Sequence, residues 1–135
     1  MAILLTPEIL AAKGDEHGEQ MAVFQWCAFN HERYPVLRRM FAIPNGGGRS
    51  AREGGRLKAE GVKRGVCDIM LPVPSGSYHG LFIEMKRRNG VPSNVNKDQK
   101  DFIEFVKSQG YCAEVAFGWE QAVRILESYL SHLSA

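Results

Sequence analysis

Two short apolar segments, at residues 65–71 and 80–86, most constrain what this chain can fold into. Seven residues suit a β-strand and are far fewer than the roughly 20 that a membrane-spanning helix requires. The sequence Pro-Val-Pro-Ser-Gly-Ser between them is rich in turn-forming residues, which favours a hairpin connection. We therefore expect two consecutive strands that pair antiparallel.

Helices and further strands are predicted on both sides of this pair. The segment 7–30 looks helical, and Asp15 is a candidate N-cap within it. Further expected elements are a strand at 37–43, a short helix at 50–60, a helix at 96–109, a strand at 111–117 and a helix at 119–133. The last strand follows a helical crossover and should run parallel to its neighbour. The 135 residues thus predict one α/β domain, 1–135, with a mixed central sheet flanked by helices.

Apolar spacing also predicts which helix faces are buried. In the first helix the expected stripe, wide enough to bury most of the circumference, consists of Met21, Phe24 and Ala28, widened by Val23, Trp26 and Cys27. In the helix at 96–109 the expected inner residues are Phe102, Phe105 and Val106. Phe29, Tyr129 and Leu130 are also expected in the core, with a subunit interface as the alternative for some aromatic residues.

Composition excludes several classes of protein. The apolar fraction of 44% and the charged fraction of 24% are those of a folded globule rather than a disordered chain. The N-terminus has no basic flank or cleavage-site pattern of a secretory signal. Three widely spaced cysteines without a CxxC pattern indicate reduced thiols. We therefore expect a cytoplasmic protein with no membrane partner.

Charge is distributed unevenly, although the net charge is only +2. Between residues 45 and 66 the basic residues are Arg49, Arg52, Arg56, Lys58, Lys63 and Arg64, against the acids Glu53 and Glu60. An anionic partner, most commonly nucleic acid, and a solvated loop explain this segment equally well. The adjoining glycines lack the GxxxxGK[ST] pattern, which argues against a nucleotide cofactor, and the four histidines lack a zinc-binding spacing.

Three ionisable residues stand out in the two apolar segments. Asp68 lies inside an apolar run, where a carboxylate is costly unless it is paired or bound to a cation. Glu84 and Lys86 are two residues apart and point to the same face of a strand. Two carboxylates beside an amine suit Mg²⁺ or Mn²⁺ and metal-assisted hydrolysis of a phosphodiester. A surface ion-pair ladder is the alternative interpretation.

These residues, in their order along the chain, resemble a known family. The chain shows Glu16 and Gln20, then Pro44-Asn45-Gly46-Gly47, Arg56-Leu57-Lys58, Asp68, Glu84-Met85-Lys86 and Gln99-Lys100. This ordered set, over about residues 14–118, resembles the VRR-NUC (virus-type replication-repair nuclease) branch of the PD-(D/E)XK nucleases. The resemblance implies the restriction-endonuclease-like fold. Where the family usually has a proline before the aspartate, this chain has Cys67.

The resemblance also implies roles for individual residues. Asp68, Glu84 and the backbone carbonyl of Met85 would hold Mg²⁺ or Mn²⁺, and Lys86 would be the catalytic lysine. The remaining site residues would be Gln99, which steadies the lysine or the phosphate, and Glu16, which reaches the metal through water, with Glu19 as the alternative to Glu16. Nucleic-acid contacts are expected from Asn45, Gly46, Gly47, Arg49, Arg52, Lys63 and Arg64.

The resemblance finally implies a DNA endonuclease that acts as a homodimer. By analogy its substrate would be branched duplex DNA such as a four-way (Holliday) junction, with a flap as the rival, and its role DNA repair. Two alternatives remain at this stage: a catalytically silent nucleic-acid-binding module with the same fold, and an interaction domain without nucleic acid.

Overall fold

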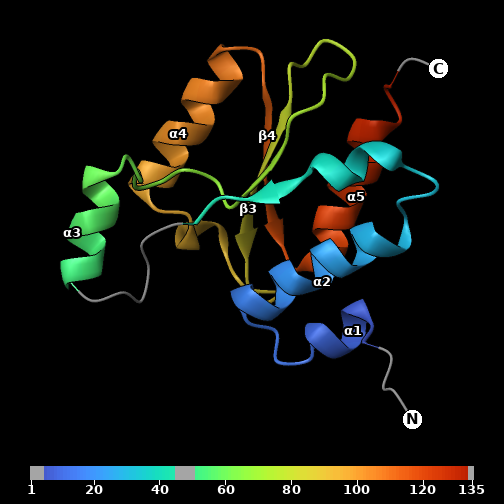
Figure 1. Ribbon diagram of the computed structural model, residues 1–135, viewed down its shortest axis with the longest axis horizontal. Coiled ribbons are helices and arrows are strands. Elements are labelled where there is room, and N and C mark those ends of the chain that lie inside the picture. Colours follow the sequence, from blue (N-terminus) through green and yellow to red (C-terminus); the bar gives the residue numbers. More distant parts are fainter. Residues whose placement is uncertain (1–4, 45–50, 134–135) are drawn as a thin grey trace.

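The computed structural model describes residues 5–44 and 51–133 of the chain (Figure 1). The helices are α1 (Pro7–Leu10), α2 (Glu16–Phe29), α3 (Ala51–Ala59), α4 (Lys97–Ser108) and α5 (Trp119–Leu130), with two 3₁₀ helices, η1 (Pro35–Arg39) and η2 (Pro92–Asn94). The strands are β1 (Phe41–Ala42), β2 (Ile69–Leu71), β3 (Leu81–Lys86) and β4 (Cys112–Phe117).

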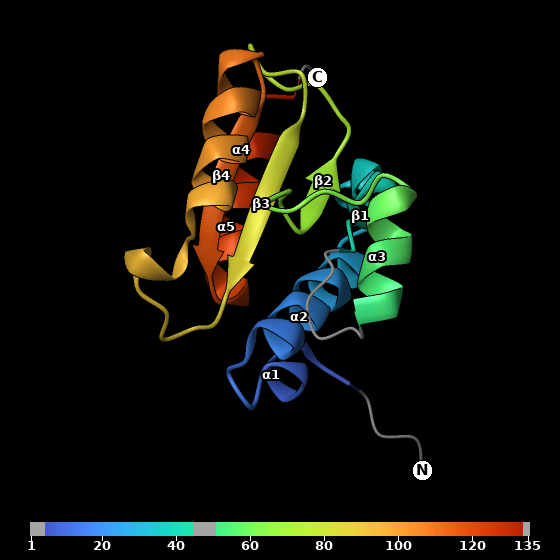
Figure 2. The ribbon, with the colours of Figure 1, turned by 90° about the vertical axis from the view of Figure 1, so that its left-hand side faces the viewer.

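The four strands form a mixed sheet in the order β1-β2-β3-β4. Strands β2 and β3 pair antiparallel, with Ile69 opposite Ile83, and β3 pairs parallel with β4. These pairings confirm the predicted hairpin, the predicted crossover and the α/β fold with a mixed central sheet. Helix α4 covers one face of the sheet and α5 the other, as Figure 2 shows in front of and behind the strands. Every residue of β3 is therefore buried.

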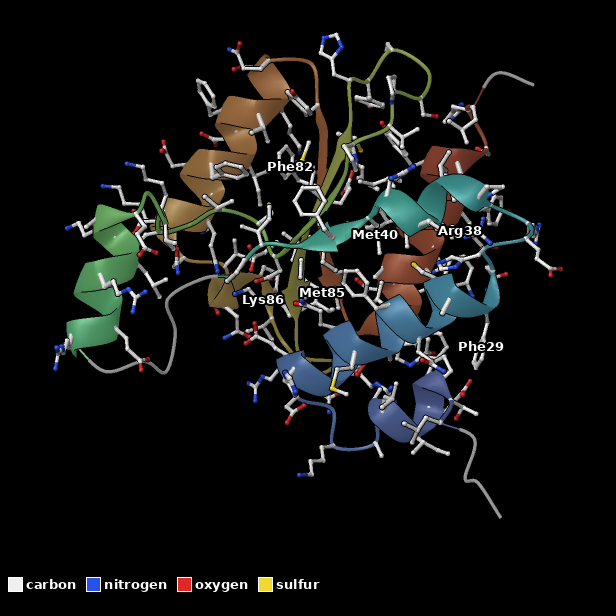
Figure 3. The ribbon with its side chains drawn as sticks, viewed as in Figure 1. Phe29, Arg38, Met40, Phe82, Met85 and Lys86 are labelled. Atoms are coloured by element: carbon white, nitrogen blue, oxygen red, sulfur yellow. The ribbon has the colours of Figure 1, made fainter. Side chains whose placement is uncertain are left out.

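Alternation along the strands divides the core in two. Ile69, Ile83 and Met85 belong to a cluster that also contains Val23 and Cys27 of α2 and Leu126 of α5. Phe82 and Ala113 pack on the opposite face against Val106 of α4. Because side chains alternate, Glu84 and Lys86 lie on the α4 face with Phe82. Figure 3 labels Met85 and Lys86 on opposite sides of β3.

Helix α2 differs from the predicted pattern in its buried face. Asp15 is its N-cap, as predicted, and accepts a hydrogen bond from Gly18 N–H at 2.8 Å. The buried residues are Gly18, Glu19, Ala22, Val23 and Cys27, whereas the expected core residues Met21, Ala28 and Phe29 are exposed. The prediction is confirmed for Val23 and Cys27, which are buried, and for Phe24 and Trp26, which pack half-buried against the core. It was wrong for the three exposed residues because it weighed only apolar side chains, whereas the helix also buries glycine, alanine and a carboxylate.

Three further expectations need correction. The predicted strand at 37–43 is a 3₁₀ helix, begun by Pro35, followed by the two-residue strand β1. The predicted strand at 65–71 begins only at Ile69, because Gly65 has φ +81° and turns the chain before it. Phe105 of α4 is 61% exposed, since Phe102 and Val106 already fill the space against Phe82.

Three other expectations hold, for the short helix, for the end of α5 and for the cysteines. Helix α3 occupies the predicted short helix and is followed by Gly61 at φ +101°. Tyr129 and Leu130 of α5 are buried, as predicted. The three cysteines are free thiols, and burial raises the pKa of Cys27 to about 12. Within the described ranges, no helix is both long enough and apolar enough to cross a membrane.

Candidate active site

Asp68 and Glu84 meet where β2 begins. Continuing the register beyond the Ile69–Ile83 pair by one residue sets Asp68 opposite Glu84. The Asp68 Oδ2 accepts a hydrogen bond from the backbone N–H of Met85 at 2.7 Å, so the carboxylate lies along the end of β3. The hairpin thereby brings together two carboxyl groups that are 16 residues apart in the sequence.

Glu84 is the more strongly perturbed of the two. Its side chain is 1% exposed, and burial, followed by the charge and hydrogen bond of Asp68, raises its pKa to about 9. Glu16 raises this pKa further, whereas Lys86 lowers it. Glu84, in a poorly solvated place beside a second carboxyl group, thus lacks sufficient positive charge around it.

Two side chains compensate Glu84 in part, both at its Oε2. Lys86 Nζ, on the same strand face, lies 3.8 Å away, and Gln99 Nε2 donates a hydrogen bond at 3.1 Å. The other oxygen, Oε1, is buried and makes no hydrogen bond with any described residue. Lys86 itself is only 6% exposed, so its ammonium lies in the same buried place as the Glu84 carboxyl group.

Gln99 is fixed by its place at the start of α4. Its backbone N–H donates to the Asn96 side chain at 2.9 Å, and its Oε1 accepts from the Asn96 N–H at 2.9 Å, which forms a capping box. With Oε1 held in the cap, Nε2 is directed at Glu84. The sequence analysis named Gln99 but missed Asn96, although the Asn-x-x-Gln spacing is a recognisable signal.

A close approach holds α4 against the start of β2. Gly65 lies so near α4 that a Cβ on it would meet the Asp98 carbonyl oxygen at 2.5 Å. Its φ of +81° is a conformation that other residues rarely adopt. The segment leading to Asp68 is thereby fixed beside the residue that precedes Gln99.

The two acidic candidates of α2 have different surroundings. Glu16 is exposed in the first turn of the helix, and its charge acts on Glu84. Glu19 is fully buried, and its Oε1 accepts a hydrogen bond from the Trp119 N–H at 3.0 Å. Arg88 Nη2 lies 3.4 Å from the same oxygen. Sequence reasoning did not single out Arg88 or Trp119.

The site fits a divalent cation by its chemistry. Carboxylate oxygens are the ligands that Mg²⁺ and Mn²⁺ prefer. The buried Glu84 Oε1, which makes no hydrogen bond with any described residue, could bind such a cation. Among the residues of 5–44 and 51–133, no three His, Cys, Asp or Glu side chains are grouped to hold a metal ion. Such a cation would therefore complete its coordination with a backbone carbonyl and waters, as Mg²⁺ commonly does.

The predicted nucleic-acid contacts are only partly within the described residues. Asn45, Gly46, Gly47 and Arg49 lie outside them. Arg52 is exposed on α3, a helix with no buried residue that lies at the periphery in Figure 1, and Lys63 and Arg64 are exposed directly before Gly65. The basic segment therefore leads into the turn that precedes Asp68.

Comparisons with known proteins agree with this fold and order of residues. The family model of the VRR-NUC domain matches residues 8–119. A solved structure described as a VRR_NUC domain protein is similar to this chain, with a TM-score of 0.73 and 27% sequence identity. The similarity covers 87% of this chain and 89% of the other. No curated protein matches the chain.

The close approach of Gly65 to the Asp98 backbone can be tested by substitution. The substitution Gly65→Ala should lower the free energy of unfolding by about 2 kcal/mol or more, because strain at positive φ adds to a clash with Asp98. Gly61→Ala is the matched control, since Gly61 also has positive φ but no heavy atom within 4 Å of a Cβ. Urea unfolding of both variants measures the difference, and equal losses would contradict the role of the clash.

Proposed function

This chain belongs to the VRR-NUC domain family, a family of nucleases, and we propose that it is a Mg²⁺- or Mn²⁺-dependent DNA endonuclease that hydrolyses phosphodiester bonds at the Asp68–Glu84 site. The observation that carries the proposal is the convergence of Asp68, Glu84, Lys86 and Gln99 on one face at the end of β3. A structural ion pair would not need two adjacent carboxyl groups with one buried oxygen left without a hydrogen bond.

Each side chain has a defined task in this proposal. Asp68, Glu84 and the Met85 carbonyl would hold the cation, and Glu16 of α2 would reach it through water. The bound cation would lower the pKa of a coordinated water and polarise the phosphodiester. Lys86 orients the attacking water or stabilises the negative charge that develops on the phosphate. Gln99 keeps Glu84 and Lys86 in place from the capped start of α4.

Between the two acids of α2, we favour Glu16 as the residue near the metal. Glu16 is exposed and its charge acts on Glu84, so it is available to a hydrated cation. The Glu19 carboxylate is instead engaged by the N–H of Trp119 and by Arg88. In this proposal the phosphate backbone of the DNA is contacted by the exposed bases Arg52, Lys63 and Arg64. The proposal also assigns phosphate contacts to four residues outside the described ranges: Asn45, Gly46, Gly47 and Arg49.

The proposed substrate is branched duplex DNA, such as a four-way junction, cut by a homodimer in DNA repair. The family resemblance supports this choice, because a homodimer would present two active sites to a branched DNA. Phosphate contacts without base contacts also favour selection by the structure of the DNA rather than by its sequence. A panel of fluorescent four-way, flap and linear DNAs, assayed with Mg²⁺ or Mn²⁺, tests this substrate choice.

Lys86→Ala should reduce cleavage by about 10²–10⁴-fold while the Kd for DNA stays unchanged, because the ammonium acts on the reacting groups. Cleavage of a labelled junction with Mg²⁺ and a binding titration without metal measure the two quantities. Lys107→Ala, which changes an exposed lysine at the far end of α4, is the control. Full activity of Lys86→Ala would refute its role, and binding without cleavage by the wild-type protein would favour the catalytically silent module.

Glu84→Gln should abolish stabilisation of the protein by Mn²⁺. At 100 times its Kd, a cation that binds only the folded state adds about 2.7 kcal/mol to the free energy of unfolding, which thermal melting detects. The variant keeps the size of the side chain but loses the negative charge that binds the cation. Glu104→Gln, an exposed acid of α4, should retain the stabilisation. An undiminished Mn²⁺ effect in Glu84→Gln would rule out this metal site.

Removing three exposed bases should weaken DNA binding in a salt-dependent way. Changing Arg52, Lys63 and Arg64 together to Ala should reduce the slope of log K against log salt by about 3, because each phosphate contact contributes about 0.9. Fluorescence anisotropy over a salt series measures the slope. The charge-matched control changes Lys13, Lys107 and Arg124, which are also exposed. Identical slopes in the two triple variants would exclude the basic segment from the interface.

A further inference from the structure

A second buried carboxylate lies outside the Asp68–Glu84 pair. Glu19 of α2 is 0% exposed, and a buried charge is costly unless it is paired and hydrogen-bonded. Its Oε1 accepts from the Trp119 N–H at 3.0 Å and lies 3.4 Å from Arg88 Nη2. Its Oε2 is buried without a hydrogen bond to any described residue, so the carboxylate depends on the groups around Oε1.

The partners of Glu19 belong to elements that are distant in the sequence. Trp119 is the first residue of α5, whose N–H has no partner within its own helix and carries the positive end of the helix dipole. Arg88 comes two residues after Lys86, at the end of β3. Gly118, the N-cap residue immediately before α5, donates its backbone N–H to the Lys86 carbonyl at 3.0 Å. Glu19 therefore ties α2 to the end of the strand that carries Glu84 and Lys86.

The same contacts fix the first turn of α2. Residues three apart lie on the same side of a helix, so Glu16 is one turn before Glu19 and projects from the same side. The Arg88 N–H also donates to the Gly14 carbonyl at 3.4 Å, which holds the turn before α2 against the end of β3. The contacts of Glu19 and Arg88 thus set the position of Glu16 relative to Glu84, although neither Glu16 nor Glu84 takes part in them.

We infer that Glu19 and Arg88 form a positioning pair for the metal-dependent site, an ion pair between a buried carboxylate and a half-exposed guanidinium that holds the first turn of α2, and with it Glu16, against the end of β3. This inference rests on the proposed function and deepens it. It gives Glu19 a role distinct from that of a metal ligand. It also gives a role to Arg88, whose side chain contacts Glu19 and Glu120 rather than the carboxyl groups of the site.

Metal affinity of the DNA-free full chain is the first test, measured with Mn²⁺ by isothermal titration calorimetry. Glu19→Gln and Arg88→Gln should each weaken Mn²⁺ binding about tenfold, the usual effect of removing a group that orients a ligand. The double variant should bind no more weakly than the weaker single variant, because both changes break one contact. Wild-type affinity in Glu19→Gln, or multiplicative losses in the double variant, would overturn the inference.

Two control variants separate positioning from general loss of stability. Glu120→Gln removes the other acid 3.4 Å from Arg88, but Glu120 is 57% exposed and should leave Mn²⁺ affinity unchanged. Val23→Ala destabilises the buried face of the same helix without touching a polar group. If Val23→Ala lowers the melting temperature as much as Glu19→Gln and also loses Mn²⁺ affinity tenfold, Glu19 is merely structural.

Cleavage kinetics and hydrogen exchange complete the experiment. In Glu19→Gln, kcat should fall about tenfold while the Kd for DNA without metal is unchanged. If the wild-type protein neither binds Mn²⁺ nor cleaves DNA, the proposed function fails, and hydrogen exchange then decides the inference by itself. Amides of residues 20–24 should exchange faster in Glu19→Gln than in Glu120→Gln. Equal exchange would overturn the positioning pair.

Discussion

The candidate site of this fold depends on holding two carboxyl groups side by side, one of them, Glu84, buried and the other, Asp68, half-buried. Burial and the neighbouring carboxyl raise the pKa of Glu84 to about 9, so the arrangement is unfavourable by itself. Lys86, Gln99 and the Met85 N–H each offset part of this cost through one contact. A divalent cation bound between the two carboxyl groups would offset the rest of this cost, which is why the proposed chemistry is assigned to this pair.

The helices serve this pair by anchoring its neighbours rather than by adding to it directly. Helix α4 is fixed through the capping box of Gln99 and the close approach of Gly65. Both contacts help to direct the side-chain amide of Gln99 toward Glu84. Helix α2 is fixed through Glu19, which pairs with Arg88, two residues after the end of β3. Buried polar groups that are paired in this way specify one arrangement of the elements more strongly than apolar packing does.

Local sequence patterns predicted the order of the elements, the hairpin and the parallel crossover. They also predicted that Glu84 and Lys86 share a strand face, because alternation along a strand is a local property. The same reasoning failed for Met21, Ala28 and Phe29 of α2 and for Phe105, since burial depends on which partner surface is present and how much space it leaves. It failed for 37–43 because the proline-initiated 3₁₀ turn outweighed the apolar run.

The sequence by itself determined which groups are available for chemistry: a carboxyl within an apolar run, the Glu-x-Lys strand and an amide at a helix start. Only the tertiary structure distinguishes the surroundings of Glu16 and Glu19, two glutamates three residues apart on one side of one helix. Helical periodicity alone predicts the same side of the helix for both. They differ because a backbone N–H 100 residues further along the chain meets one carboxylate and leaves the other exposed, and only the folded arrangement of α5 against α2 creates that contact.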